Sequence, residues 1–436
     1  MELGLGGLIA VLMTGLVVLL LSGMPIAFSL LMMGLAGLFF LVGTPKAAAL
    51  SAWDEVNNYV FAAAPLYILM GEVLHRSGLS EEIFISLNKW LGRFPGGLIH
   101  PVIGSCAIFA AVSGSSVATA ATVGRVAFPA MKQRNYNPKL MYGAVAAGGT
   151  LGILIPPSII MIIYGGMTNV SIGRLFFGGF IPGILLALTF MTYVALWTRI
   201  SPSIAPASGE RVLWGDRFRA LSGLVTVFML MAIVFGGIYL GIMTPTEAAA
   251  IGAFAALIIA TVRGRMSLRL LADALWGTVM MTSMILMIMA GAAIFGYVIH
   301  FLRIPVLLVE WVGGLGVSPH TVLFFVCLLL YVLGCFIEGT SVLIILTPIL
   351  VPLMVSVGFD PVWFGIIFVI NIEVALITPP VGLNLFVIKG VEPESTFGQI
   401  FLGAAPFVGL MTFMIILLAA FPQLVLWLPD LAFGGG

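Results

Sequence analysis

Charged residues are scarce in this sequence of 436 residues. Asp, Glu, Lys and Arg make up 8% of it, whereas an average soluble domain carries about 25%. Hydrophobic residues make up 61%, more than a water-soluble fold can hide. Apolar runs recur from Leu5 to Leu428, and about 20 such residues form one helix across a bilayer. We therefore predict an all-α polytopic membrane protein.

Other features that the sequence lacks exclude several classes of function. The three cysteines, Cys106, Cys327 and Cys335, lie in apolar stretches without C-x-x-C spacing, which indicates core residues. The net charge of +1, without a basic stripe, argues against a nucleic-acid partner. No Walker A pattern is present, so we expect no nucleotide cofactor and no ATP hydrolysis by that route.

Regular membrane spans are predicted where an apolar run is uninterrupted. The first 22 residues lack the positive n-region of a signal peptide and lead directly into a second run, which predicts a permanent helix. The predicted spans cover residues 5–22, 25–43, 61–75, 175–199, 220–242, 247–262 and 272–300.

Two further apolar stretches, 98–131 and 320–356, are interrupted by Ser113-Gly114-Ser115-Ser116 and Glu338-Gly339-Thr340-Ser341. We predict that each turns back at mid-depth as a re-entrant hairpin. With the N-terminus outside, this topology puts most of the 18 Lys and Arg inside, as the positive-inside rule requires, and puts both termini in the periplasm. The basic residues left outside are Lys46, Arg174 and Arg303.

The last two stretches, 138–167 and 361–388, contain Pro156-Pro157 and Pro379-Pro380. Proline cannot donate a backbone hydrogen bond to the preceding turn, so we predict two broken helices.

Glycine, histidine, hydroxyl and proline positions recur between the two halves of the chain. A separation of 225 residues relates Gly71, Val73, His75, Gly114, Ser116 and Thr122 to Gly296, Val298, His300, Gly339, Ser341 and Thr347. A separation of 223 relates Pro129, Pro138, Pro156 and Pro157 to Pro352, Pro361, Pro379 and Pro380. An odd number of predicted crossings separates the repeat starts, so the second repeat is inverted. Inverted repeats are typical of alternating-access transporters with a site at the membrane midplane.

The tips and breaks offer oxygen ligands. Backbone groups left unpaired at membrane depth cost several kcal/mol each unless they line a cavity or bind something polar. Neutral carbonyls and hydroxyls at helix breaks suit Na⁺, so we predict two Na⁺ sites, one per repeat. Helix packing through small residues is the alternative, which the duplication disfavours. The predicted Na⁺ ligands are Ser113, Gly114, Ser115, Ser116, Gly152 and Pro156 in the first repeat, and Gly339, Thr340, Ser341, Thr378 and Pro379 in the second.

Helix N-termini at these breaks favour an anion. Half-helices predicted to begin at Ser116, Ser158, Ser341 and Val381 direct their positive ends toward one region, which predicts a small organic anion as cargo. Arg125 is a further candidate, although snorkelling toward the cytoplasm is the favoured interpretation. The other predicted substrate-binding residues are Ser116, Pro157, Ser158, Ser341, Pro380, Val381, Gly382 and Asn384.

Three acids, Glu72, Glu338 and Glu373, are candidate proton carriers. A charged side chain inside a membrane is energetically unfavourable, so one that is present there is commonly functional. Glu72 precedes a helix end, and Glu338 can pair at its tip. Glu373 lies deepest, and for it we favour a structural hydrogen bond.

Three motifs resemble one family. Gly114-Ser115-Ser116, Ile155-Pro156-Pro157-Ser158 and the run from Ile377 to Phe386 are similar to the large membrane subunit of tripartite ATP-independent periplasmic (TRAP) transporters. The resemblance implies a scaffold with a mobile elevator domain, Na⁺-driven uptake across the bacterial inner membrane, a separate small four-helix membrane subunit and a soluble periplasmic binding protein. It places the family's ion-binding positions at the same tips and breaks. Members carry dicarboxylates, sialic acids, other acids or sulfonates.

Together these observations predict four parts: N-terminal scaffold helices (1–60), a first inverted repeat (61–200), central scaffold helices with cytoplasmic loops (201–285) and a second repeat (286–430). The predicted function is Na⁺-coupled, binding-protein-dependent uptake of a small organic anion. One alternative is a one-component Na⁺- or H⁺-coupled carrier of the same superfamily. Another is an intramembrane hydrolase with Ser115 or Ser116 as nucleophile, for which no nearby His or Lys base is evident.

Overall fold

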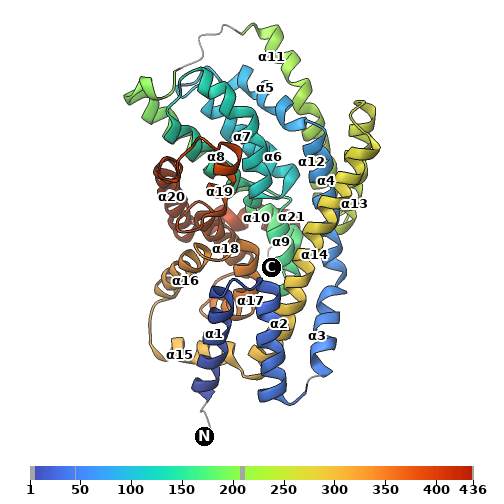
Figure 1. Cartoon of the computed structure of the whole chain (residues 1–436), viewed down its shortest axis with the longest axis vertical. Coiled ribbons are helices and arrows are strands. Elements are labelled where there is room, and N and C mark those ends of the chain that lie inside the picture. The colour runs from blue at the N-terminus through green and yellow to red at the C-terminus, as the bar shows by residue number, and fades with distance from the viewer. Residues whose placement is uncertain (1–4, 45, 207–211, 435–436) are drawn as a thin grey trace.

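The computed structural model describes residues 5–44, 46–206 and 212–434. Every regular element within them is helical, which confirms the all-α prediction (Figure 1). Seven helices of this described part are long and apolar enough to cross a membrane. Parts of the predicted domains, residues 1–4, 45 and 207–211, lie outside the described residues, and the domain limits stay a prediction.

The N-terminal helices pack along the longest helix of the molecule, α14 (Leu268–Phe301). Close approach depends on glycine, since a Cβ at Gly34 would lie 2.7 Å from the backbone nitrogen of Phe295. The helices of this group are α1 (Leu5–Leu21), α2 (Ile26–Gly37) with a π-helical extension (Leu38–Val42), α3 (Lys46–Val56), and α4 (Ala63–Arg76), which a short 3-10 turn (Tyr59–Ala62) precedes.

The first interrupted stretches form a hairpin and a broken helix. Asn137 caps the broken helix by accepting from the backbone nitrogen of Lys139, and Pro138 takes its first turn. The elements are α5 (Leu79–Leu91), α6 (Ile99–Ser113), α7 (Ser116–Gln133), α8 (Pro138–Leu154), α9 (Ile159–Thr168) and α10 (Ile172–Ile200). We call α6 and α7 hairpin 1.

The centre of the chain contributes the 3-10 turn Pro202–Ile204, then α11 (Trp214–Ala220), α12 (Ser222–Tyr239), α13 (Pro245–Val262), α14 and α15 (Ile304–Gly314). A capping box begins α13: Thr244 accepts from the backbone nitrogen of Glu247, whose carboxylate accepts from Thr244.

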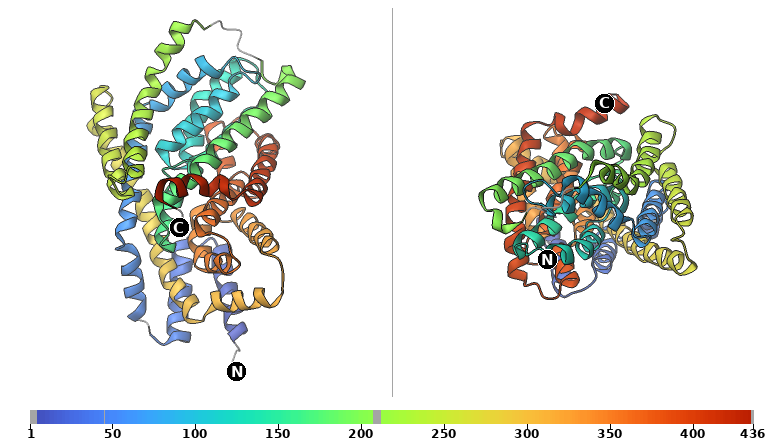
Figure 2. Two further views of the ribbon diagram at one scale, coloured as in Figure 1. Left: turned by 180° about the vertical axis from the view of Figure 1, so that it is seen from behind. Right: turned by 90° about the horizontal axis from the view of Figure 1, so that it is seen from above.

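The second interrupted stretches repeat the pattern. The elements are α16 (Pro319–Gly334), α17 (Gly339–Ser356), α18 (Pro361–Leu376), α19 (Leu383–Val391), α20 (Phe397–Ala420) and α21 (Gln423–Phe433). We call α16 and α17 hairpin 2. Hairpin 1 lies in the upper half of Figure 1 and hairpin 2 in the lower half, with both broken helices between them; Figure 2 shows the same arrangement from behind.

The predicted spans miss α20, which is long and apolar enough to cross a membrane, and the shorter α21 that follows it. Four other short helices outside the predicted spans are α3, α5, α11 and α15. Their hydrophobic stretches are too short to cross a bilayer, so a search for spans passes over them. Helix α5 is amphipathic: Leu79, Ile83 and Leu87 are buried, whereas Glu81 is exposed.

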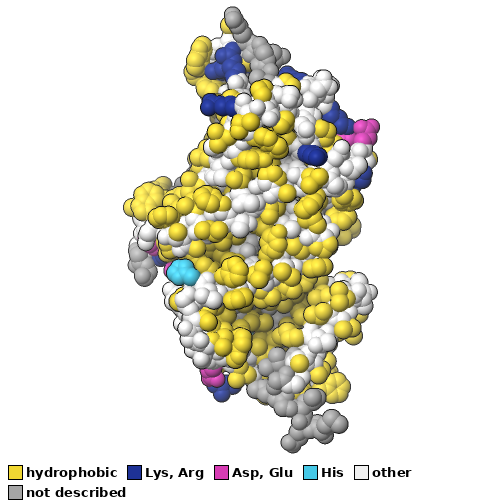
Figure 3. Space-filling model, turned by 90° about the vertical axis from the view of Figure 1, so that its left-hand side faces the viewer, with side chains coloured by type: hydrophobic (Ala, Val, Ile, Leu, Met, Phe, Trp, Pro, Cys, Tyr) yellow, Lys and Arg dark blue, Asp and Glu magenta, His cyan; other side chains and the backbone are white. Residues whose placement is uncertain are grey.

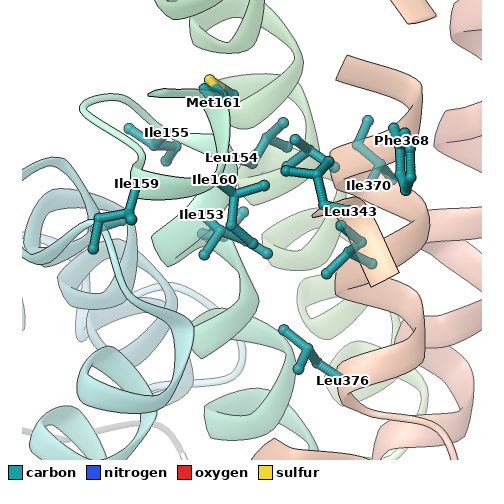
Figure 4. Packing of buried hydrophobic residues seen from close by; sticks show 14 of the residues in the cluster. Ile153, Leu154, Ile155, Ile159, Ile160, Met161, Leu343, Phe368, Ile370 and Leu376 are labelled. Carbon is teal, nitrogen blue, oxygen red and sulfur yellow. The ribbon is translucent and has the colours of Figure 1, made fainter. Parts of the chain in front are cut away.

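Apolar side chains cover the middle of the molecule, and Lys and Arg gather mainly at the end that contains α11 (Figure 3). Inside, residues 140–165 of the α8–α9 segment are buried. Figure 4 shows its apolar side chains, including Ile153 and Ile160, beside Leu343 of α17 and Ile370 of α18. The two broken helices and hairpin 2 thus share one core.

Backbones touch where α8 crosses α20. A Cβ on Gly143 would overlap the carbonyl oxygen of Gly403, and a Cβ on Gly403 would overlap that of Lys139. Both contacts are with backbone, which cannot rotate away.

We therefore expect Gly143→Ala to lower the free energy of unfolding by about 1–3 kcal/mol, the usual cost of overpacking. Thermal unfolding of the purified protein in detergent measures it. The control is Gly409→Ala on α20, where nothing lies within 4 Å of the added Cβ. Equal melting temperatures for the two variants would contradict this prediction.

Candidate functional site

The turn of hairpin 1 is held by its own hydroxyls. Gly114 has φ +59°, a left-handed conformation suited to glycine, and ends α6. Ser115 begins α7 by accepting from the backbone nitrogen of Ala118 at 3.4 Å. The hydroxyl of Thr119 donates to the carbonyl oxygen of Ser115 at 2.7 Å and lies 2.8 Å from that of Ser113. Thr119 was missed by the sequence analysis, although it lies one turn after Ser115.

This turn lies against the first broken helix. A Cβ on Gly152 would be 2.6 Å from the carbonyl oxygen of Ser115 and 2.8 Å from the hydroxyl of Thr119. A Cβ on Gly114 would be 2.9 Å from the carbonyl oxygen of Pro157. The structure therefore brings together residues predicted from the first tip and the first break.

The first break lies between α8 and α9 and contains a cis Pro156–Pro157 bond. Ser158 is fully buried and accepts from the backbone nitrogen of Met161 at 3.4 Å, so α9 begins directly after it. A helix N-terminus at this position agrees with the sequence prediction.

Hairpin 2 differs from its prediction. The carboxylate of Glu338 caps α17, accepting from the Ser341 backbone nitrogen at 3.1 Å and hydroxyl at 3.2 Å, and from the Thr340 hydroxyl at 2.8 Å. The helix therefore begins at Gly339, not at Ser341. The prediction of neutral oxygens alone at this tip is wrong, because a carboxylate occupies the hydroxyls of Thr340 and Ser341. Local pairing of Glu338 is confirmed.

The second break contains a cis Pro379–Pro380 bond. The hydroxyl of Thr378 donates to the carbonyl oxygen of Val374 at 2.6 Å, and the backbone nitrogen of Val381 donates to Cys335 at the turn of hairpin 2 at 3.1 Å. Gly382 has φ +54°, so α19 begins at Leu383 and not at Val381.

Asn384 connects the two repeats. Its buried amide nitrogen donates to the hydroxyl of Ser116 at 2.7 Å and to the carbonyl oxygen of Ala146 at 3.2 Å. Its amide oxygen has no hydrogen-bond partner among the described residues. The second break therefore contacts hairpin 1 as well as hairpin 2.

The base of hairpin 1 is joined to the second repeat by Lys132, which lies 2.6 Å from Glu392 and 2.9 Å from Glu394. The hydrogen bonds that Lys132 donates to these carboxylates raise the pKa of its ammonium group, and the same contact lowers the pKa of Glu394.

The remaining charged candidates, Glu72, Arg125 and Glu373, lie in different environments. Glu72 pairs with Arg76 at 2.8 Å near the end of α4. Arg125 is exposed on α7. Glu373 is fully buried, and neither carboxylate oxygen has a hydrogen-bond partner in the part of the chain that the structure describes. The structural hydrogen bond predicted for Glu373 is therefore wrong.

The site is built from neutral oxygen atoms. Within the described ranges no three His, Cys, Asp or Glu side chains come together. Hydroxyl and carbonyl oxygens do, around Ser115, Thr119 and Gly152.

The fold is that of a multi-spanning membrane transporter. It resembles the solved structure of the YdaH transporter of Alcanivorax borkumensis with a TM-score of 0.62 and 15% identity, covering 85% of this chain and 88% of that one.

Sequence comparison gives the family. Residues 13–424 match the profile of the tripartite ATP-independent periplasmic transporter, DctM component. The C4-dicarboxylate TRAP transporter large permease protein DctM of Pseudomonas aeruginosa is 36% identical over 91% of this chain and 93% of its own length. The sialic acid TRAP transporter large permease protein SiaM of Vibrio cholerae is 33% identical over 96% of this chain and 97% of its own. The chain therefore belongs to the large permease subunits of TRAP transporters, and the hydrolase alternative is wrong.

Asn384→Asp should loosen hairpin 1, because a carboxylate cannot donate to the carbonyl oxygen of Ala146, and the loss of one hydrogen bond costs about 0.5–1.5 kcal/mol. Hydrogen–deuterium exchange of residues 113–119 measures the effect, and we expect faster exchange there. The control is Asn57→Asp, an exposed position. Unchanged exchange in the Asn384 variant would show that its hydrogen bonds do not hold hairpin 1.

Proposed function

We propose that this chain imports a small organic anion, of the carboxylate or sulfonate class, across the bacterial inner membrane, coupled to Na⁺ and dependent on a periplasmic binding protein. A transport domain containing the hairpins and broken helices moves against the scaffold as an elevator. The main support is the convergence of the Ser115 carbonyl, the Thr119 hydroxyl and the backbone of Gly152 at the junction of a hairpin turn and a helix break.

The first proposed Na⁺ site uses these oxygens, together with Ser113, Gly114 and Ser116 and with carbonyls freed near Pro156. The second uses Thr378 and carbonyls near Pro379 opposite Gly339. A hydroxyl that donates one hydrogen bond keeps lone pairs for a cation, so the bond from Thr378 to Val374 leaves it able to act as a ligand. Glu338 adds a negative charge to the second tip, which favours a cation there.

The substrate region that we propose lies between the tips. Helices α7, α9, α17 and α19 begin there, and unpaired N–H groups of a first turn attract an anion. The carboxylate of Glu338 repels an anion from hairpin 2, so we place the anionic group nearer to Ser116, Pro157, Ser158 and Asn384. Two of the named relatives take carboxylic acids, C4-dicarboxylates and sialic acid, which supports this class. Ser341, Pro380, Val381 and Gly382 would line the other wall.

The family implies a small membrane subunit and a periplasmic binding protein as partners. Lys and Arg gather at the end near α11 (Figure 3), so under the positive-inside rule we place this end in the cytoplasm. Hairpin 2 and the N-terminal end lie in the opposite half of the molecule, which we place toward the periplasm (Figure 1). A periplasmic C-terminus stays a prediction. The exposed apolar surface then faces lipid and the partner subunit.

The direct test is uptake by proteoliposomes that contain this chain and its small partner, with candidate acids presented by the cognate binding protein. We expect uptake only with both an inward Na⁺ gradient and the binding protein. Uptake without the binding protein would favour the one-component alternative, and uptake without Na⁺ would reject Na⁺ coupling.

Thr378→Val removes one proposed Na⁺ ligand without changing the shape of the side chain. We expect the Na⁺ concentration for half-maximal uptake to rise on the order of ten-fold, the effect of losing one interaction of about 1–1.5 kcal/mol. The matched control is Thr192→Val on α10, whose hydroxyl also donates to a carbonyl four residues earlier. Equal Na⁺ dependence of the two variants would argue against the second site.

Buried, unpartnered Glu373 is the observation that favours H⁺ as an alternative coupling ion. For Na⁺ coupling we expect Glu373→Gln to keep Na⁺-driven uptake within about two-fold, because it removes no hydrogen bond of the described residues. Imposing a proton gradient alone measures the alternative, with exposed Glu310→Gln as the control. Proton-driven uptake that Glu373→Gln abolishes would contradict Na⁺ coupling.

A further inference from the structure

Hairpin 1 is docked on α4. Nδ1 of His75 on α4 lies 2.8 Å from the hydroxyl oxygen of Thr122 on α7. One turn earlier, Gly71 lies against the end of α6, since a Cβ there would be 3.1 Å from both the Cα of Ser113 and the carbonyl oxygen of Val112. A glycine and a hydrogen bond thus hold helix and hairpin together.

Hairpin 2 packs on α14, but it does not make the corresponding His–Thr contact, although the same residue types recur 225 residues later. The hydroxyl of Thr347 on α17 is buried and has no partner among the described residues, and His300 on α14 is exposed. Nothing lies within 4 Å of a Cβ placed on Gly296. These three residues line one cavity of about 540 Å³ between α14 and α17.

Helices α14 and α17 carry the same residue types that form the contact between α4 and α7. A buried hydroxyl without a partner is destabilising, and the imidazole of His300 can satisfy it as His75 satisfies Thr122. Gly296 leaves the surface of α14 open for the backbone of hairpin 2, as Gly71 does on α4. Polar Ser51, Asp54 and Glu55 of α3 also line the cavity, so water can fill the space while this contact is broken.

We propose that His75–Thr122 and His300–Thr347 are alternative contacts, each made in one end state of the transport cycle and broken in the other. Gly71 and Gly296 are the matching docking surfaces for the two hairpins. The inference rests on the proposed transport function, because it needs the hairpins to move against α4 and α14. The structure corresponds to the state in which the His75–Thr122 contact is made and the His300–Thr347 contact is not. A two-state element of this kind keeps the two contacts from being made, or broken, together.

Cysteine cross-linking tests the exchange independently of transport. In a chain with Cys106, Cys327 and Cys335 replaced by serine, we introduce H75C with T122C, or H300C with T347C. Disulfides need Cβ atoms about 3.5–4.5 Å apart, so each pair reports one docked state. We expect both pairs to form in reconstituted protein, and any Na⁺ or substrate condition that increases one to decrease the other. The mismatched pair H75C with T347C should not form.

Failure of the second pair to cross-link under any condition, in protein whose wild type transports, would overturn the proposal. So would two pairs that rise and fall together. If the wild type transports none of the tested anions but the pairs still exchange, the proposed substrate is wrong and the docking proposal stands.

Gly296→Leu tests the docking surface, because nothing lies within 4 Å of the added Cβ and the residue lines the cavity of about 540 Å³, which has room for the rest of the side chain. We expect the melting temperature to stay unchanged, uptake to fall at least about ten-fold because the second state is depopulated, and the H75C–T122C cross-link to increase. Gly236→Leu on α12 is the control, since nothing lies within 4 Å of its Cβ either. Uptake by Gly296→Leu equal to that of the control would overturn the proposal.

Discussion

Unpaired backbone groups inside an apolar solvent are the constraint on which the rest of this structure depends. Four helices stop within the molecule, and each exposes N–H and C=O groups that lipid cannot satisfy. Side chains satisfy some of these backbone groups: Ser115, Ser158 and Glu338 each accept a hydrogen bond from the first turn of the following helix. Hydrogen bonds between segments satisfy others, as when the backbone nitrogen of Val381 donates to the carbonyl oxygen of Cys335. The groups left over are those that a bound ion or anion can use.

The side chains that cap these helices differ between the two halves of the chain. A neutral hydroxyl, Ser115, caps the returning arm of hairpin 1, whereas a carboxylate, Glu338, caps that of hairpin 2. The first tip is therefore a place of neutral oxygens, and the second adds a negative charge. Two related repeats with one structural plan thus offer different electrostatics to a cation and to an anion.

Close packing determines which parts of the molecule form one unit. Gly143 and Gly403 bring α8 and α20 into backbone contact, and Asn384 ties α19 to both α7 and α8. Contacts of the hairpins with α4 and α14 are unequal by comparison, since His75 has a partner and His300 has none of the same kind. The hairpins and broken helices therefore share dense, hydrogen-bonded contacts, whereas the surface toward α14 is partly open.

The sequence by itself determined the all-α membrane class, the family, and the positions of the breaks at Gly114, Pro156–Pro157 and Pro379–Pro380, because scarce charge, glycine and proline act locally. It missed the long helix α20 and the short helices α3, α5, α11, α15 and α21. It also misplaced the starts of α17 and α19 by two residues, because a carboxylate cap at Glu338 and a left-handed Gly382 moved these starts. Only the tertiary structure decided that Thr119 joins the first tip, that Glu373 has no partner among the described residues, and that Asn384 reaches Ser116, 268 residues away. Such contacts depend on how distant segments pack, and no local pattern in the sequence encodes them.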